Sequence, residues 1–250
     1  MKKNMNRLLL CFLAIFFSCS NDDGQATVSE ESPNSTSSSN LIMPLGASRV
    51  QGLRPEFESY RYELWKLLVD TGVNFDYIGT QEDEASYPIY KNHSFDMDHE
   101  GRGGWTSGQI LNEITSWISQ TGVPDIVLFS SPAGNDALEG LSYDAALLNI
   151  NGIIDAIQAS NPNVIIIIEQ LAPARSGQMT PQLTTYFNNL QQDVVTIATN
   201  QSTTSSRILV VDMATGFTDA MLADDVHYNE AGARFIATRY FEVLQTILRE

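Results

Sequence analysis

Four consecutive isoleucines at 165–168 leave this chain few choices of fold. A strand turns successive side chains to opposite faces, so a run that is apolar at every position needs apolar cover on both faces. Such cover is typical of a central strand in a parallel sheet that lies between two layers of helices. The run therefore predicts an α/β fold.

Five short runs of β character, this one included, divide the chain after its first forty residues. They span 41–45, 75–79, 126–130, 164–169 and 208–212. Apolar residues at helical spacing lie at 57–68 and 110–118, and further helices are expected at about 139–160, 180–200 and 229–249. This alternation predicts three α/β/α layers around a five-stranded parallel sheet, with functional loops at the carboxyl ends of its strands.

The chain begins with a segment that is typical of export. Three basic residues precede the apolar run 8–17, which is too short to span a bilayer and is typical of a signal peptide. The run leads into a segment that ends at Cys19 and is similar to a bacterial lipobox, where the cysteine carries the lipid. We therefore expect a lipoprotein signal peptide at 1–19. The alternative is an ordinary cleaved signal peptide with an incidental cysteine.

A polar segment separates this signal from the globular part of the chain. Residues 20–40 are rich in Ser, Asn, Thr and Glu, and this composition predicts a disordered tether. Residues 41–250 form one predicted domain. The acidic pair Asp22 and Asp23 is similar to surface-export signals. The sequence thus predicts an exported lipoprotein of the cell envelope, held to the membrane through Cys19 and exposed at the cell surface.

Charge and cysteine content exclude several classes of function. The net charge is −16, with only 14 Lys and Arg, so a clustered basic surface for nucleic acid is not expected. Both cysteines, Cys11 and Cys19, precede the predicted domain, which leaves it without a disulfide, a thiolate nucleophile or a cysteine metal site. No metal-binding motif or phosphate-binding loop is present, and we expect no cofactor. The oligomeric state stays open.

Three polar motifs lie where predicted strands end or helices begin. Gly46 allows a sharp turn that can lift the hydroxyl of Ser48 out of the sheet, although most such triplets are ordinary turns. The amide of Asn135 can stabilise an oxyanion, or it can form an Asx-turn beside Gly134.

The third motif is a carboxylate three residues before a histidine. Asp224 can reach Nδ1 of His227 and leave Nε2 to take a proton from a serine; a capping loop with a surface histidine is the alternative. The other histidines are poorer candidates. His93 lacks a carboxylate in register, and the acidic neighbours of His99 in sequence should point away from it. His227 is therefore the predicted base.

These motifs together resemble a known family. Ser48, a glycine of the loop 101–105, Asn135 and His227 occur in the order that names the SGNH hydrolases, also called the GDSL family. The resemblance covers essentially all of 41–250. It implies a flavodoxin-like SGNH hydrolase fold, a catalytic triad of Ser48, His227 and Asp224, and an oxyanion hole.

The resemblance also implies which groups form that oxyanion hole and what the substrate is. The donors are the N–H of Ser48, the N–H of Gly104 and the amide of Asn135. The glycine–tryptophan loop is similar to that of carbohydrate acetylesterases, which implies a serine esterase for short acyl groups, acetyl foremost, on carbohydrates. Trp105 could line the substrate pocket or cover the following helix, and Arg175 is interpreted as a solvated loop charge or a substrate contact.

One departure from the family pattern keeps alternatives open. Ala47 stands where the family has an aspartate that organises neighbouring loops. The alternatives are a non-catalytic carbohydrate-binding lipoprotein on a hydrolase scaffold, and an acyl hydrolase of the lipase or thioesterase type. No Leu- or Phe-rich lid over a long-chain lipid site is visible in the sequence.

Overall fold

A computed structural model describes residues 40–248, and a parallel sheet is the centre of its fold. The strands lie in the order β2-β1-β4-β5-β6, which is the flavodoxin-like order once the short β3 is set aside. Their bounds are Asn40–Gly46 (β1), Phe75–Tyr77 (β2), Glu100–Gly101 (β3), Ile126–Phe129 (β4), Ile165–Gln170 (β5) and Arg207–Asp212 (β6).

All five predicted strands are present, but the predicted number of five is corrected to six. The additional strand, β3, has two residues and pairs in parallel with the end of β1, at Leu45 and Gly46. A charged residue followed by a glycine carries no apolar pattern, so nothing in the sequence indicates this strand.

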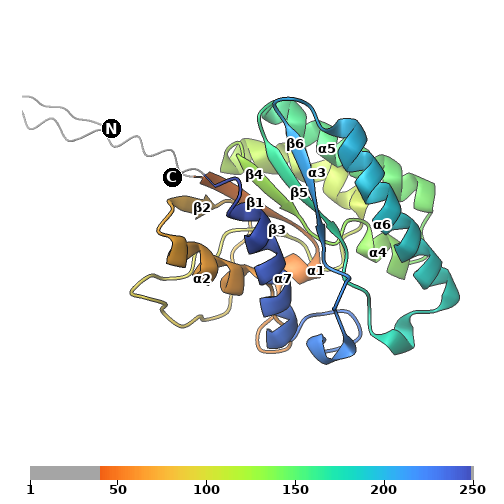
Figure 1. Cartoon of the computed structure of the whole chain (residues 1–250), viewed down its shortest axis with the longest axis horizontal. Helices are drawn as coiled ribbons and strands as arrows, with labels where there is room; N and C mark the ends of the chain where they lie inside the picture. The colour runs from red at the N-terminus through yellow and green to blue at the C-terminus, as the bar shows by residue number, and fades with distance from the viewer. Residues whose placement is uncertain (1–39, 249–250) are drawn as a thin grey trace, which may run out of the picture. The chain divides into compact units, whose positions relative to one another are not determined.

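Helices cover both faces of the sheet, which confirms the predicted α/β class (Figure 1). The helix bounds are Ser48–Gln51 (α1), Arg61–Thr71 (α2), Ser107–Thr121 (α3), Gly134–Leu138 (α4), Tyr143–Ser160 (α5), Pro181–Gln201 (α6) and Glu230–Leu244 (α7). Helices α2 and α7 pack on one face, and α3, α5 and α6 pack on the other.

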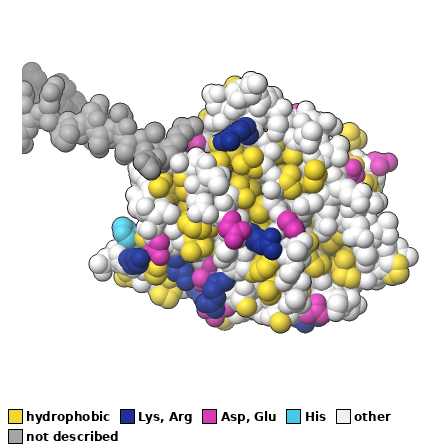
Figure 2. All heavy atoms as spheres, viewed as in Figure 1, with side chains coloured by type: hydrophobic (Ala, Val, Ile, Leu, Met, Phe, Trp, Pro, Cys, Tyr) yellow, Lys and Arg dark blue, Asp and Glu magenta, His cyan; other side chains and the backbone are white. Residues whose placement is uncertain are grey.

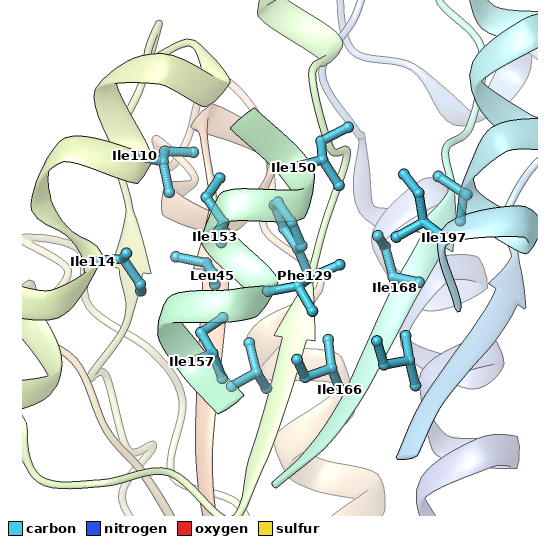
Figure 3. Packing of buried hydrophobic residues seen from close by; sticks show 14 of the residues in the cluster. Leu45, Ile110, Ile114, Phe129, Ile150, Ile153, Ile157, Ile166, Ile168 and Ile197 are labelled. Atoms are coloured by element: carbon cyan, nitrogen blue, oxygen red, sulfur yellow. The ribbon is translucent and has the colours of Figure 1, made fainter. Parts of the chain in front are cut away.

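The isoleucine run of β5 shows why both faces need cover. Ile166 and Ile168 point into the cluster under α3, α5 and α6, while Ile167 points into the cluster under α2 and α7. All three are fully buried, and Figure 3 shows Ile168 between Phe129 of β4 and Ile197 of α6. The strand is therefore central, as the sequence predicts.

Helix ends follow local signals at some positions and depart from the expected bounds at others. The apolar spacing at 57–68 is helical only from Arg61, so Phe57 lies before α2, and the helix expected at 229–249 ends at Leu244. Thr106 caps α3 in a capping box with Gln109, and Gly72 ends α2 in a left-handed conformation. The expected helix at 139–160 begins only at Tyr143, because Gly140, at φ +67°, separates α5 from the short α4.

Several predictions concern the start of the chain. The signal peptide at 1–19, Cys19 and nearly all of the tether 20–40 lie outside the described residues, while Asn40 is already part of β1. No helix in the described part of the chain is long and apolar enough to cross a membrane.

Candidate active site

Ser48 begins α1, directly after β1 at the carboxyl edge of the sheet. The chain turns at Gly46, where an added Cβ would lie 2.8 Å from both the carbonyl oxygen of Ser130 and Cγ2 of Val50. Only glycine fits between the residue that follows β4 and the side chain of Val50 in α1. The turn carries Ser48 out of the sheet, as the sequence predicts.

The side chains of Ser48, His227 and Asp224 form a continuous hydrogen-bonded line. Nε2 of His227 lies 2.8 Å from Oγ of Ser48, and Nδ1 lies 2.7 Å from Oδ2 of Asp224. The other oxygen of Asp224 accepts the backbone N–H of His227 at 2.7 Å. These bonds fix the carboxylate against the imidazole.

The charge state of Asp224 sets the direction of these hydrogen bonds. Burial raises the pKa of its carboxyl, but the hydrogen bonds from His227 and from the backbone outweigh burial and lower the pKa to about 2. An ionised carboxylate only accepts, so Nδ1 of His227 carries the proton and Nε2 is left to accept one from Ser48.

Arg175 holds the loop that carries this acid. Its guanidinium donates to the carbonyl oxygen of Asp224 at 2.7 and 3.1 Å, and its backbone N–H donates to the carbonyl oxygen of Asp225 at 2.7 Å. Arg175 is more than a solvated loop charge, because the half-buried residue joins the loop after β5 to the loop of Asp224; a substrate contact stays a prediction.

Asn135 and the glycine loop face Ser48 from the other side. One open cavity of about 360 Å³ is lined by Ser48, Gly103, Gly104, Asn135 and His227, among others. Asn135 lies in the first turn of α4, not in a loop, and its amide donates to the carbonyl oxygen of Trp105 at 2.8 Å. An amide has two N–H groups, so one remains for a ligand in the cavity.

The two glycines differ in what their N–H groups bind. The N–H of Gly103 donates to Oε1 of Gln51 at 2.7 Å. No acceptor for the N–H of Gly104 is found among residues 40–248, and its φ of +78° is one that glycine adopts freely. The geometry therefore leaves Gly104 the freer donor, although its role stays a prediction.

His99 supports this glycine loop through a hydrogen bond to its backbone. The residue is buried, its Nδ1 accepts the N–H of Gly101 at 2.9 Å, and its Nε2 lies 3.2 Å from Asp83. Burial, together with the charge of the fully buried Arg61, lowers the pKa of His99 to about 4. A neutral, enclosed imidazole without access to Ser48 is a support, not a base.

Trp105 packs against the core and does not line the cavities beside Ser48. Its ring lies 5.5 Å from that of Trp117, and Arg102 lies over both rings. What it contributes to the site is its backbone carbonyl, which orients Asn135. A substrate contact of the Trp105 ring stays a prediction.

Within residues 40–248, no group of three or more His, Cys, Asp or Glu side chains gathers where it could hold a metal ion. On the face that Figure 2 shows, Lys and Arg side chains lie beside Asp and Glu side chains.

A serine hydroxyl held against a histidine–aspartate pair, beside N–H donors, is an arrangement typical of enzymes that hydrolyse ester and amide bonds. The chain belongs to the GDSL-like lipase/acylhydrolase family, whose sequence model matches residues 79–235. The matched stretch includes Asn135, Asp224 and His227, and Ser48 precedes it. No curated protein sequence matches the chain.

Solved structures with the same fold include carbohydrate esterases. A carbohydrate esterase family 3 structure from Talaromyces cellulolyticus is 26% identical, with a TM-score of 0.71, over 83% of this chain and 97% of that chain. A mutant acetyl esterase with an acetate ion is 27% identical, with a TM-score of 0.71 and the same coverage. A family 3 carbohydrate esterase from Clostridium thermocellum is 25% identical, with a TM-score of 0.67, over 84% of this chain and all of that one.

Proposed function

We propose that this protein is a serine esterase that removes short acyl groups, acetyl foremost, from carbohydrates. The observation that carries the proposal is the position of Nε2 of His227, 2.8 Å from Oγ of Ser48, with Nδ1 bound to an ionised Asp224. This arrangement supports removal of the serine proton as the oxygen attacks a carbonyl.

The reaction then proceeds through an acyl-enzyme. Attack by Ser48 converts the ester carbonyl to a tetrahedral oxyanion, which the N–H groups of Ser48 and Gly104 and the amide of Asn135 stabilise. The imidazolium of His227 gives its proton to the leaving alcohol. Water, deprotonated by the same imidazole, releases the acid and restores Ser48. No cofactor is needed for these steps.

Two cavities beside Ser48 support a short acyl group. The leaving oxygen must lie near His227, so the alcohol occupies the open cavity that His227 lines. The other cavity, of about 30 Å³, does not include His227 in its wall. Its wall combines polar residues, which include Arg49, Ser131 and Asn135, with the apolar side chains of Leu138, Leu171, Ala174, Phe187 and Val226. A space of this size holds about two water molecules, or the end of a short acyl group.

The alcohol side supports a carbohydrate. The open cavity of about 360 Å³ is walled by Phe57 and Leu53 as well as by the glycine loop. Aromatic side chains provide an apolar face with a rigid shape, which suits a sugar ring. The likeness to family 3 carbohydrate esterases and to an acetyl esterase adds support for this substrate class.

The test is ester hydrolysis by the wild type beside Ser48→Ala. We expect release of acetate from 4-nitrophenyl acetate and from an acetylated polysaccharide, abolished by the substitution. Binding of the polysaccharide without turnover in either protein would favour a non-catalytic carbohydrate-binding protein, the alternative raised by Ala47 in place of the family aspartate. Rates that rise with acyl length past about eight carbons would favour an acyl hydrolase of the lipase type.

We also propose that the protein is an envelope lipoprotein, anchored by a lipid on Cys19 and carried on the tether 20–40. Because several acyl chains together anchor a protein stably, Cys19→Ala should release it from the membrane fraction. Undiminished membrane retention of Cys19→Ala would contradict the anchor and leave the esterase proposal unaffected.

A further inference from the structure

Arg49, which follows Ser48 directly, donates to the backbone of two separate loops although it is only 8% exposed. Its Nε donates to the carbonyl oxygen of Val226 at 2.8 Å. Its terminal nitrogens donate to the carbonyl oxygens of Ala172 at 2.8 Å and Pro173 at 3.2 Å. A buried guanidinium is tolerated only where acceptors meet its N–H groups, so these contacts fix its position.

Each of these acceptors adjoins a functional group. Val226 is the residue before His227, so the Nε bond joins the nucleophile and base segments directly. Pro173 lies two residues before Arg175, whose guanidinium holds the carbonyl oxygen of Asp224. Arg49 therefore joins the segment of Ser48 directly to the loop of the acid and base at Val226, and to the loop after β5, which Arg175 in turn joins to Asp224.

A fourth contact of Arg49 reaches toward the oxyanion side. Nη1 of Arg49 lies 3.4 Å from Oγ of Ser131, and Gly134 donates its N–H to the carbonyl oxygen of Ser131 at 3.0 Å. Asn135 is the next residue. The backbone of Ser131 has a φ of +46°, a conformation that residues other than glycine adopt only when their surroundings hold them in it.

Glu169 holds Ser131 through its side-chain carboxyl group. It is fully buried at the end of β5, and its Oε2 accepts the backbone N–H of Ser131 at 2.6 Å. Ser131 thus stands between a buried carboxylate and a buried guanidinium. Burial raises the pKa of the Glu169 carboxyl, while hydrogen bonds, the one from the backbone of Ser131 among them, and to a smaller extent the charge of Arg49 act against that rise. The ring of Tyr228 packs against the guanidinium of Arg49, with its centroid 4.8 Å from Cζ.

We propose that Arg49 is a positioning residue, which holds the segments of Ser48, His227 and Asn135 in their mutual geometry. The inference rests on the proposed function, in which those three residues act together. Ala47 has no side-chain acceptor or donor to join these loops, and Arg49, two residues later, makes the connections from the same turn.

The test compares Arg49→Met and Arg49→Lys with wild type in the full chain. Arg234→Met is the matched control, because Arg234 is an exposed helix residue paired with Glu230 on the same helix. Three quantities are measured: kcat and KM for 4-nitrophenyl acetate, the thermal midpoint, and the low-field proton NMR signal of Nδ1–H of His227. Asp224→Asn identifies that signal by removing it.

We expect Arg49→Met to lower kcat by about 100-fold at a temperature where it is folded, because displaced reacting groups lose proximity. KM should change by less than about threefold, and the His227 signal should broaden or vanish. Arg49→Lys should recover part of kcat, since an ammonium reaches fewer carbonyl oxygens. Arg234→Met should match wild type.

A folded Arg49→Met protein with wild-type kcat and an intact His227 signal would overturn the proposal, even with a lower thermal midpoint. If Arg49→Met does not fold, Arg49→Lys decides in the same way: unchanged kcat and an unchanged signal contradict a positioning role. Absence of Ser48-dependent turnover in wild type would refute the proposed function instead, and the His227 signal alone would then decide the role of Arg49.

Discussion

Phe57 lies stacked on the imidazole of His227, with the ring centroids 3.9 Å apart and an angle of 12° between the planes. The contact is fixed by the backbone next to each ring, because the N–H of Glu58 donates to the carbonyl oxygen of Tyr228 at 2.8 Å. Phe57 therefore covers one face of the base and limits rotation of its ring, while Asp224 and Ser48 hold its edges.

Removal of this ring should slow the reaction. We expect Phe57→Ala to lower kcat by about tenfold, because a stacked aromatic pair contributes about 0.5–1.5 kcal/mol. Phe57→Tyr retains the ring and should keep kcat near wild type. Steady-state hydrolysis of 4-nitrophenyl acetate measures both. Equal kcat for Phe57→Ala and Phe57→Tyr would show that the stacking does not orient His227.

Asn135 should act on the transition state and not on substrate binding. Loss of one oxyanion donor costs about 100- to 1,000-fold in kcat. We expect a fall of this size in Asn135→Asp, whose carboxylate cannot donate, with KM nearly unchanged. The kcat and KM of the two proteins measure this. A raised KM with wild-type kcat would instead make Asn135 a residue that binds the substrate in its ground state.

The sequence predicts the parts of the site that follow strand ends. Ser48 and Asn135 come after β1 and β4, and parallel strands end at one edge, so their proximity follows from topology. Asp224 and His227 are close in sequence, and a spacing of three residues in a loop allows their contact.

Other parts of the site depend on pairings that no local pattern reveals. Phe57 reaches His227 only through the pairing of Glu58 with Tyr228, and the acceptors of Arg49 lie at 172, 173 and 226. Propensity and periodicity report on neighbours in the chain, whereas these contacts join distant segments.

Asp224 should stay ionised through most of the acid range. Its pKa of about 2 lies below the ordinary value of 3.8, so it stabilises the folded chain above pH 3.8 and loses this contribution as the pH falls toward 2. The difference in unfolding free energy between wild type and Asp224→Asn should therefore be constant above about pH 5 and shrink below it.

Denaturant unfolding at a series of pH values measures this difference. A difference that already declines between pH 7 and pH 5 would mean that the Asp224 carboxyl is not held by His227. Asp224→Asn should also lower kcat by about 100- to 10,000-fold, because the imidazole loses its fixed tautomer.

The small cavity beside Ser48 should set acyl length. Phe187 and Ala174 lie in its wall and are nearly fully buried, so a change of their volume changes the cavity. Phe187→Leu should raise the rate on 4-nitrophenyl butyrate relative to acetate by about tenfold, and Ala174→Val should lower that ratio. Ratios of kcat/KM measure the effect. A ratio that neither substitution moves would place the acyl group elsewhere.

The most direct test of Ser48 as nucleophile is to trap the acyl-enzyme. Wild type, mixed rapidly with 4-nitrophenyl acetate and quenched in acid, should gain the mass of one acetyl group per chain, on the peptide that contains Ser48. Ser48→Ala should gain none. Turnover in wild type without any acetylated Ser48, or with the acetyl group on another residue, would contradict the triad of Ser48, His227 and Asp224.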